Sequence, residues 1–378
     1  MHSTLSIDQT NRDSQLVPLH WQQLWSLSAL YASIIVGWIA YQNYQPKLLI
    51  QFQFTEFSFL LLVVQGLVLT ITPIIAGKLG DRFRFKAGHR LPIITSGTAF
   101  AAMIFMAVAF TLLADPGGIF KWVLPVLIVG WLIAMSIFTS PALSTLELFT
   151  PVERLPHAMA LLTIVSNLVY SLEPVIVDII DFLGAPITFI VGGLAVFTSG
   201  YALKTTSLSL FSQSGGKEAT AFKLDTQRSN YRLIFILGLA LGTATTLLFY
   251  FFPAVLDKII STPVFGMSGN WMLTSMLLMS AVMSIPISSF IRNYGLEKSF
   301  WLSLAFTGAS ALGVVFIASP IPLIVVTVVF AFSFTLLSLS SLPLAIRSAN
   351  YYEKVYCVGI FFSGAALPEG IVQAWLAL

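Results

Sequence analysis

The sequence has few of the residues on which soluble proteins and most enzymes depend. Only 9% of its 378 residues are charged, against roughly a quarter in an ordinary soluble domain. Its single cysteine, Cys357, excludes an intramolecular disulfide, and its four histidines are scattered along the chain. It contains no Walker phosphate loop and no HExxH motif. We therefore expect no enzyme activity, no cofactor and no metal site.

Long apolar segments are what the chain has in abundance. Hydrophobic residues make up 57% of the sequence, and the mean hydropathy is +0.89. A helix needs about 20 largely apolar residues to cross roughly 30 Å of hydrocarbon. Continuous runs of this length favour helices over the alternating pattern of a membrane barrel. We predict an all-α membrane protein with eleven spans, at residues 23–43, 57–78, 92–113, 120–144, 156–179, 184–204, 231–252, 268–291, 299–318, 321–345 and 355–376.

The basic residues alternate between the two sides that these spans define. Sixteen of the nineteen Lys and Arg residues fall in the N-terminal tail and the even-numbered loops, and three (Lys47, Lys121 and Lys258) fall in the odd-numbered loops. Because basic residues gather on the cytoplasmic side of a membrane, we predict a cytoplasmic N-terminus, an outward-facing C-terminus and residence in the cell (inner) membrane. The net charge of +3 then reflects topology, and we expect no nucleic-acid partner.

Polar segments divide the predicted helices into two bundles. We expect a cytoplasmic tail at 1–22, a six-helix bundle at 23–204, a cytoplasmic linker at 205–230 and a five-helix bundle at 231–378. A weak internal repeat supports two halves, since Glu173-Pro174 in the fifth span corresponds to Pro368-Glu369 in the eleventh. Transporters built from two halves hold their substrate between them. The second half is one helix short, and lipid or a partner helix in place of a twelfth span could cover the missing surface.

Two glutamates, Glu173 and Glu369, lie well inside predicted spans. Each is about 15–17 residues past the cytoplasmic start of its helix, or roughly 22–26 Å along it. Because an ionised carboxylate in hydrocarbon costs several kcal/mol, each must be protonated, open to a water-filled cavity or paired with a bound cation. Proton coupling is one interpretation. A permanently protonated donor to a carbonyl freed by the adjacent proline is another, and direct substrate contact is a third.

Polar and aromatic side chains inside the spans are candidates for a substrate site. They are Trp38, Tyr41, Gln42, Gln65, Asn167 and Tyr170. The three-residue spacing of Asn167, Tyr170 and Glu173 places them on one face of a helix. Amides and phenols suit a neutral hydroxylated solute such as a sugar, and also many other small molecules. We expect Tyr44 and Gln45 to lie in the aromatic belt at the membrane interface.

The most specific motif is the basic loop after the second span. It reads GKLGDRF at residues 77–83 and continues to Gly88, Arg90 and Pro92. It resembles the cytoplasmic signature of major facilitator superfamily transporters, G-x-L-[GAS]-D-R-[FY]…G-R-[RK]. Four extra residues between its two parts resemble the spacing of the sucrose and glycoside-pentoside-hexuronide branches. The segment from Glu147 to Arg154 resembles the D-x-x-x-P-x-x-R element of the same superfamily.

The resemblance implies a two-bundle helical transporter fold of about eleven spans. It implies a secondary active transporter that moves a small solute, such as a sugar or glycoside, across the lipid bilayer by alternating access. A proton gradient would drive it through Glu173 and Glu369, by symport or antiport. The residues expected to gate are Gly77, Asp81, Arg82, Gly88, Arg90, Glu147 and Arg154. Among them, Asp81, Arg82, Glu147 and Arg154 would form an interlock that favours the outward-facing state.

Two alternatives remain open at this stage. The basic loop could be an ordinary positive-inside loop that only fixes the topology. The whole chain could be a non-transporting membrane scaffold or assembly factor, because light-harvesting assembly proteins resemble transporters in this same loop.

Overall fold

The computed structural model describes residues 19–52, 54, 58–114, 120–151, 154–221, 228–260, 269–317 and 319–376. Most of the predicted tail (1–18) and part of the predicted linker (222–227) lie outside these residues. In the part of the chain that is described, the secondary structure is helical and includes no strand. The all-α prediction is therefore confirmed.

The helices follow the order that the hydropathy pattern predicts. They are α1 (Trp21–Gln51), α2 (Ser58–Ala87), α3 (Leu91–Leu113), α4 (Phe120–Leu143), α5 (Leu146–Phe149), α6 (Leu155–Ser171), α7 (Glu173–Leu183), α8 (Ala185–Ala221), α9 (Tyr231–Thr246), the π-helical turn η3 (Leu247–Phe251), α10 (Phe252–Ile260), α11 (Gly269–Tyr294), α12 (Leu296–Phe316), α13 (Pro320–Arg347), the 3₁₀ turn η4 (Tyr351–Glu353) and α14 (Lys354–Leu376). Over the described residues, ten helical segments are long and apolar enough to cross a membrane, and α6 with α7 forms a bent pair that makes an eleventh.

Two helices extend well beyond their predicted ends. Helix α1 continues through Pro46 to Gln51 instead of stopping at residue 43. Tyr44 is buried within it and donates a hydrogen bond of 2.6 Å to the carbonyl of Ile180, and Gln45 is buried as well. The prediction that Tyr44 and Gln45 belong to an interfacial belt was therefore wrong. Helix α8 runs on to Ala221, so the first part of the predicted linker is helical.

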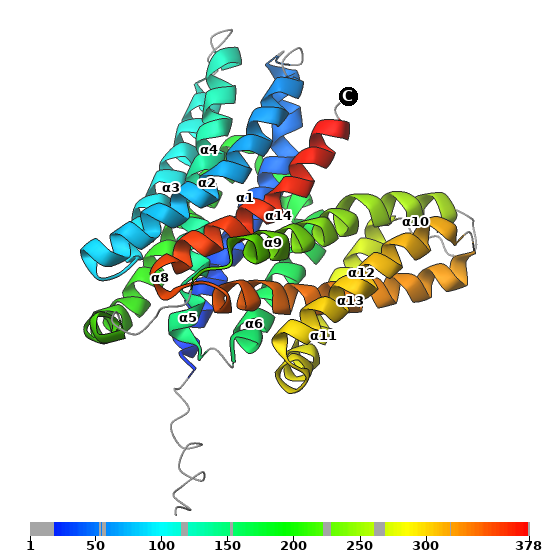
Figure 1. Cartoon of the computed structure of the whole chain (residues 1–378). Helices are drawn as coiled ribbons and strands as arrows, with labels where there is room; N and C mark the ends of the chain where they lie inside the picture. Colours follow the sequence, from blue (N-terminus) through cyan, green and yellow to red (C-terminus); the bar gives the residue numbers. More distant parts are fainter. Residues whose placement is uncertain are drawn as a thin grey trace, which may run out of the picture.

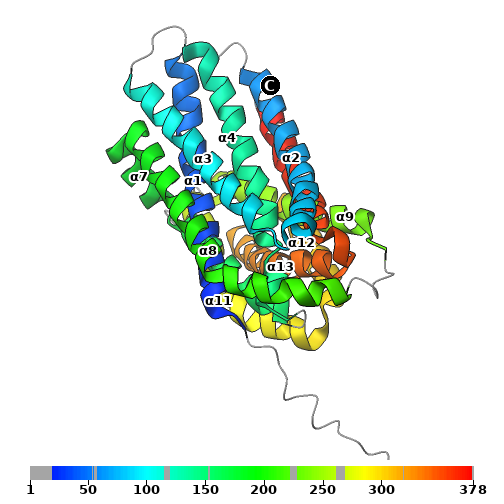
Figure 2. The ribbon, with the colours of Figure 1, turned by 90° about the vertical axis from the view of Figure 1, so that its left-hand side faces the viewer.

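Two helix pairs join the N-terminal helices to the C-terminal ones. Helix α14 packs mainly against α2 and α9, and α6 packs mainly against α11. Figures 1 and 2 both show α14 running beside α2, although the two helices are far apart in the sequence. In Figure 1, α3, α4 and α8 lie on one side of this contact and α10–α13 lie on the other. The space between the two groups of helices contains the cavity described below.

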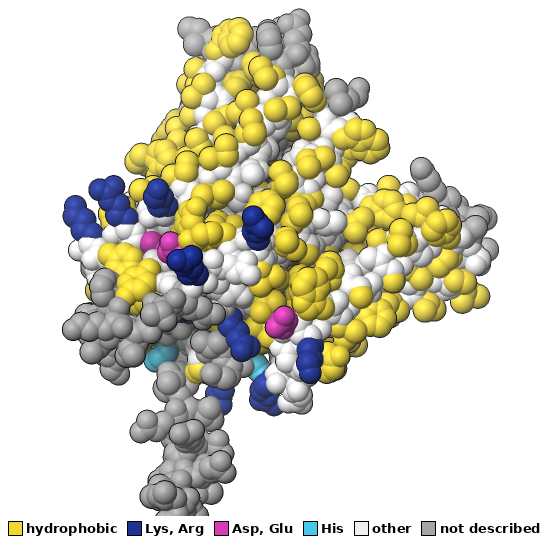
Figure 3. All heavy atoms as spheres, viewed as in Figure 1, with side chains coloured by type: hydrophobic (Ala, Val, Ile, Leu, Met, Phe, Trp, Pro, Cys, Tyr) yellow, Lys and Arg dark blue, Asp and Glu magenta, His cyan; other side chains and the backbone are white. Residues whose placement is uncertain are grey.

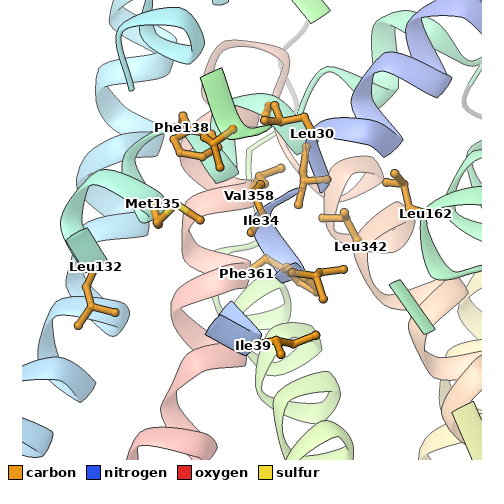
Figure 4. Packing of buried hydrophobic residues seen from close by; sticks show 14 of the residues in the cluster. Leu30, Ile34, Ile39, Leu132, Met135, Phe138, Leu162, Leu342, Val358 and Phe361 are labelled. Atoms are coloured by element: carbon orange, nitrogen blue, oxygen red, sulfur yellow. The ribbon is translucent and has the colours of Figure 1, made fainter. Parts of the chain in front are cut away.

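Glycines allow α14 to approach its neighbours closely. A Cβ atom on Gly359 would overlap the backbone carbonyl of Pro73 in α2, and one on Gly238 of α9 would overlap the carbonyl of Phe361. Small residues are typical of helix contacts in membranes, where close packing replaces the hydrophobic effect as the driving force. Buried side chains from both groups of helices then fill the junction, among them Leu30 and Ile34 of α1 with Val358 and Phe361 of α14 (Figure 4).

The surface has the polarity of a membrane protein. Large apolar side chains such as Phe182, Val282 and Phe316 are more than two-thirds exposed, which suits contact with lipid. Figure 3 shows these apolar faces in yellow, while Lys and Arg gather toward one end of the molecule. That end carries the last turns of α2, α11 and α13, where Arg84, Arg292 and Arg347 lie. The chain is thus a multi-pass membrane protein.

Candidate functional site

A cavity of about 450 Å³ lies between the two groups of helices. Its polar lining residues are contributed by α1, α6, α7, η3, α9, α11 and α14, and include Gln42, Tyr170, Glu173, Tyr250, Asn270 and Glu369. The two glutamates that the sequence singles out therefore face the same cavity, together with Gln42 and Tyr170 of the predicted substrate residues. This volume is in the range of sites that bind small molecules.

Glu369 is the central polar group of this region. It also borders two neighbouring cavities of about 270 and 300 Å³. Its Oε1 atom accepts hydrogen bonds from Gln373 Nε2 at 3.0 Å and from the Tyr250 hydroxyl at 3.4 Å. Gln373 Nε2 also donates a hydrogen bond of 3.1 Å to the Tyr250 hydroxyl. Among the described residues, the hydrogen bonds of this carboxyl are made to side chains rather than to a carbonyl freed by Pro368.

Glu173 lies at a break in the fifth span. Helix α6 ends at Ser171, α7 begins at Glu173, and the two axes differ by 58°. The expectation that Asn167, Tyr170 and Glu173 share one continuous helix face was therefore wrong. Tyr170 and Glu173 reach the cavity, whereas Asn167 is buried and donates a hydrogen bond of 2.7 Å to Ser280 of α11. Thr335 of α13 donates to the same serine at 2.7 Å, so Asn167 takes part in a contact between helices, and it also borders a separate cavity of about 190 Å³ together with Tyr170.

The N-terminal helices supply an aromatic wall. Trp38, Tyr41 and Gln65, all predicted substrate residues, line the neighbouring cavity of about 300 Å³ together with Gln42 and Glu369. The ring centroids of Trp38 and Tyr41 are 5.6 Å apart in an edge-to-face arrangement. Tyr41 also stacks on Trp131 of α4 at 4.6 Å. The sequence reasoning missed Trp131, Tyr250 and Gln373. Only Gln373 had a usable signal, because it lies four residues after Glu369 and so on the same helix face.

A second polar cluster lies at the basic end of the molecule. The carboxylate of Asp81 accepts hydrogen bonds from the backbone N–H groups of Val355 at 3.2 Å and Tyr356 at 2.8 Å, in the first turn of α14. A carboxylate in this position satisfies N–H groups that have no partner within the helix and interacts favourably with the helix dipole. Asp81 therefore ties the end of α2 to the start of α14.

Glu147 is the other acidic member of this cluster. Its Oε1 atom lies 2.6 Å from Arg90 Nη2, and its Oε2 atom lies 2.5 Å from Lys354 Nζ. Arg90 is 1% exposed and also donates to the carbonyl and hydroxyl oxygens of Ser144 at 2.7 and 2.8 Å. Since Glu147 lies in α5 and Lys354 begins α14, these ion pairs connect α5 and the α2–α3 connection to the C-terminal helices.

The expected interlock has different members from those predicted. Arg82 is exposed, and neither it nor Arg154 makes a side-chain hydrogen bond or ion pair with any residue in the described ranges. Arg84 is the arginine of α2 that contacts the C-terminal half of the chain. Its Nη1 atom donates to the carbonyl of Tyr351 at 2.8 Å, and its guanidinium lies 4.3 Å from the centre of the Tyr351 ring. A Cβ atom on Gly77 would overlap the backbone carbonyl of Val355, so α2 and α14 are in close contact there. Gly88 follows the last residue of α2 and has a φ of +75°.

No group of three or more His, Cys, Asp or Glu residues that could hold a metal ion occurs in the described part of the chain. The cavity is lined by two carboxyl groups, and no Lys, Arg or His is among its described lining residues. The site can therefore exchange protons or neutralise a positive charge, and it offers no counter-charge to an anion.

These features define a class of protein: a multi-pass helical membrane protein with two helix bundles around a central polar cavity. The chain belongs to the Major Facilitator Superfamily, whose family model matches residues 26–368. It is accordingly a membrane transporter and not an enzyme. Membership of the sucrose or glycoside-pentoside-hexuronide branch stays a prediction. No curated protein matches the sequence.

Solved structures share the fold at low sequence identity. A bacterial homologue of the iron transporter ferroportin, in an outward-facing state with soaked iron, matches with a TM-score of 0.65 and 16% identity over 96% of this chain and 92% of that chain. The proton:xylose symporter XylE, bound to 6-bromo-6-deoxy-D-glucose, matches with a TM-score of 0.59 and 12% identity over 94% and 90%. The E. coli fucose:proton symporter FucP matches with a TM-score of 0.54 and 16% identity over 92% and 91%.

Proposed function

We propose that this protein is a secondary active transporter that moves a small solute by alternating access and couples this movement to a proton gradient. The observation that carries the proposal is the pair of carboxyls, Glu173 and Glu369, in one cavity between the two bundles. The sequence contains no nucleotide-binding loop, so uphill transport would draw on an ion gradient. The bundles correspond to residues 23–204 and 231–378.

The orientation follows from the basic residues. We assign the end that carries Arg84, Arg90 and Lys354 to the cytoplasm, because basic loops are retained on that side. The bonds of Asp81 and Glu147 to α14 then close the cytoplasmic side. This conformation corresponds to an outward-facing state, with the N-terminus in the cytoplasm and the C-terminus outside.

The cytoplasmic cluster acts as the gate in this proposal. For the inward-facing state to form, α2 and α14 must separate at their cytoplasmic ends, and Asp81 must release the first turn of α14. The ion pairs of Glu147 with Arg90 and Lys354 hold the same junction. Gly77 belongs to the gate because it lets α2 approach the backbone of Val355 closely. Gly88 belongs to it because its positive φ lets the chain turn between α2 and α3.

Proton coupling is assigned to Glu369 first and Glu173 second. Glu369 touches all three cavities of the central region and is held by Tyr250 and Gln373. A carboxyl group in this setting takes up a proton on one side of the membrane and releases it on the other, and so alternates between the protonated and the ionised form as its access to water changes sides. The amide and phenol groups of Gln42, Gln65 and Tyr170 can bind hydroxyl groups, so a sugar or glycoside is one candidate for the solute.

Transport by protein reconstituted in liposomes tests the proposal. With a pH-sensitive dye inside the liposomes, a compound panel should contain a solute that drives proton movement in the wild-type protein and none in the Glu369→Gln and Glu173→Gln variants. Asp178→Asn is the matched control, since Asp178 is an exposed carboxyl of α7 that does not line the cavity. A membrane scaffold would give no solute-dependent flux and would co-purify with a stoichiometric partner.

A further inference from the structure

The charge around the central cavities is unbalanced. Glu173 and Glu369 are the charged groups among the described residues that line the three central cavities, and none of those residues is Lys, Arg or His. An ionised carboxylate in a poorly solvated site costs several kcal/mol unless a positive charge compensates it. Over a transport cycle, either a proton or a bound cation must supply that charge.

The carboxyl of Glu369 is oriented to receive such a charge. Both of its hydrogen bonds, from Gln373 and Tyr250, fall on Oε1. Within the described residues, Oε2 has no hydrogen bond, and Glu369 faces cavities of about 450, 270 and 300 Å³. One carboxylate oxygen is therefore held in place while the other is available to a ligand.

Aromatic rings surround this carboxyl. Tyr170, Phe249 and Tyr250 line the main cavity, and the rings of Tyr170 and Phe249 pack edge to face at 5.0 Å. Trp38 and Tyr41 line the neighbouring cavity that Glu369 also borders. Aromatic faces attract cations, and the attraction grows when the cation is desolvated. They also provide the apolar contact that the body of an organic molecule needs.

A buried amide beside the same carboxyl is a second polar group suited to a ligand. Gln65 is only 3% exposed, lines the same cavity as Glu369, and its Nε2 atom has no hydrogen-bond partner within the described residues. Gln45 lines the same cavity, and its Nε2 atom likewise has no hydrogen-bond partner within the described residues. Buried polar groups are normally satisfied, so these amides are suited to bind a polar atom of a bound molecule.

We propose that the transported solute is a monovalent organic cation with an aromatic or apolar body, and that its positive charge binds to the carboxylate of Glu369 in exchange for one proton. This inference rests on the proposed function and specifies its substrate. When the cation enters, the proton of Glu369 passes to water in the open cavity. When the cation leaves on the other side, the carboxylate takes up a proton there. The exchange is one for one and carries no net charge.

The titratable groups that face Glu369 determine the pH dependence. They are the phenols of Tyr31, Tyr41, Tyr170 and Tyr250 and the carboxyl of Glu173. Phenols stay neutral at ordinary pH, which leaves Glu173 as the other group that can hold a proton. Because the cation and the proton compete for one carboxylate, cation binding should weaken as the pH falls, by up to about tenfold per pH unit where Glu369 is protonated.

Calorimetric binding to the full-length protein in lipid nanodiscs tests the inference. The probes are phenyltrimethylammonium and its neutral carbon isostere tert-butylbenzene, with empty nanodiscs to correct for partition into lipid. We expect the wild-type protein to bind the cation at least about tenfold more tightly than the isostere, a difference of about 1.4 kcal/mol. Repeating the titration in two buffers of different ionisation enthalpy should show release of about one proton per cation at low pH.

Variants locate the charge preference. Glu369→Gln should bind the two probes equally, whereas Glu369→Asp and the control Asp178→Asn should retain the preference. Since the wild-type comparison alone tests the charge preference, a variant that fails to fold does not remove the test. Equal binding of the two probes by the wild-type protein would overturn the inference. Tighter binding of glucose, methyl glucoside or manganese(II) than of phenyltrimethylammonium would also overturn it.

Failure of the inference can be told apart from failure of the proposed function. Sugar-driven proton flux in liposomes, without any preference for the cationic probe, would reject the organic cation and retain the transporter. Selective cation binding that depends on Glu369 but never drives proton flux would retain the cation site and reject coupled transport.

Discussion

The carboxylate of Asp81 accepts a hydrogen bond of 2.8 Å from the backbone N–H of Tyr356, which lies 275 positions later in the chain. The N–H of Val355 donates to the same side chain at 3.2 Å. Both donors belong to the first turn of α14, where N–H groups have no partner inside the helix. A side chain of one bundle therefore caps a helix of the other, and the bundles cannot separate here without exposing that helix end.

We predict that Asp81→Ala makes Cys357 more reactive toward maleimides. Cys357 is the only cysteine in the chain, is fully buried and follows Tyr356 directly. Loss of a helix cap costs about 1 kcal/mol, so the population with separated cytoplasmic ends, and with it the alkylation rate, should rise about fivefold. Arg82→Ala is the control, because Arg82 is exposed on the same helix. Equal labelling rates in both variants and the wild-type protein would contradict the gate.

We predict that Glu147→Gln destabilises the protein far more than Lys354→Met. Glu147→Gln leaves the guanidinium of Arg90 buried without a carboxylate, which costs roughly 3–5 kcal/mol. Lys354 is 19% exposed, so it can reach water when its partner is removed, and its loss leaves Glu147 still paired with Arg90; we therefore expect a smaller cost. Thermal unfolding in detergent, followed by the reaction of Cys357 with a thiol dye, measures both. Similar melting temperatures for the two variants would show that the Arg90 pair is not the stronger contact.

The helices and the family could be predicted from the sequence because hydropathy and charge act locally. Eleven apolar runs and one basic loop are enough to establish a multi-pass topology and the superfamily motif. Which arginine joins the gate could not be predicted, because that depends on how far α2 extends. Helix α2 continues to Ala87, so Arg84 lies three residues from Asp81 and shares its face, whereas Arg82 is turned by about 100°.

The cavity was only partly predictable for a similar reason. Glu173, Glu369, Tyr170 and Gln42 are recognisable because polar groups are rare inside spans. The bend of 58° after Ser171 turns Glu173 off the helix face that carries Asn167 and Tyr170, and Asn167 bonds Ser280 of α11 instead of reaching the main cavity. The π-helical turn at Leu247–Phe251 changes the rotation of Tyr250 relative to a regular helix and leaves no trace in the hydropathy pattern.

We predict that Gly359→Ala strongly weakens the contact between α2 and α14. A Cβ atom at this position would overlap the backbone carbonyl of Pro73, and a backbone atom cannot move aside like a flexible side chain. Overpacking of this kind costs about 1–3 kcal/mol. Gly308→Ala is the matched control, since a Cβ atom there meets open space and alanine favours the helix by up to about 1 kcal/mol. Unfolding by increasing concentrations of SDS should show opposite shifts for the two variants, and equal shifts would contradict the close approach.

We predict that Asn167→Ala lowers stability without changing affinity for the transported solute. The amide of Asn167 is 4% exposed and donates to Ser280, which links α6 to α11. A hydrogen bond between membrane helices contributes about 0.6–1.7 kcal/mol, and SDS-induced unfolding measures its loss. Gln42→Ala should behave in the opposite way, because Gln42 is exposed in the main cavity and its removal alters the KM of uptake. If Asn167→Ala raised the KM as much as Gln42→Ala does, Asn167 would belong to the substrate site after all, on the helix face that its spacing from Tyr170 first suggested.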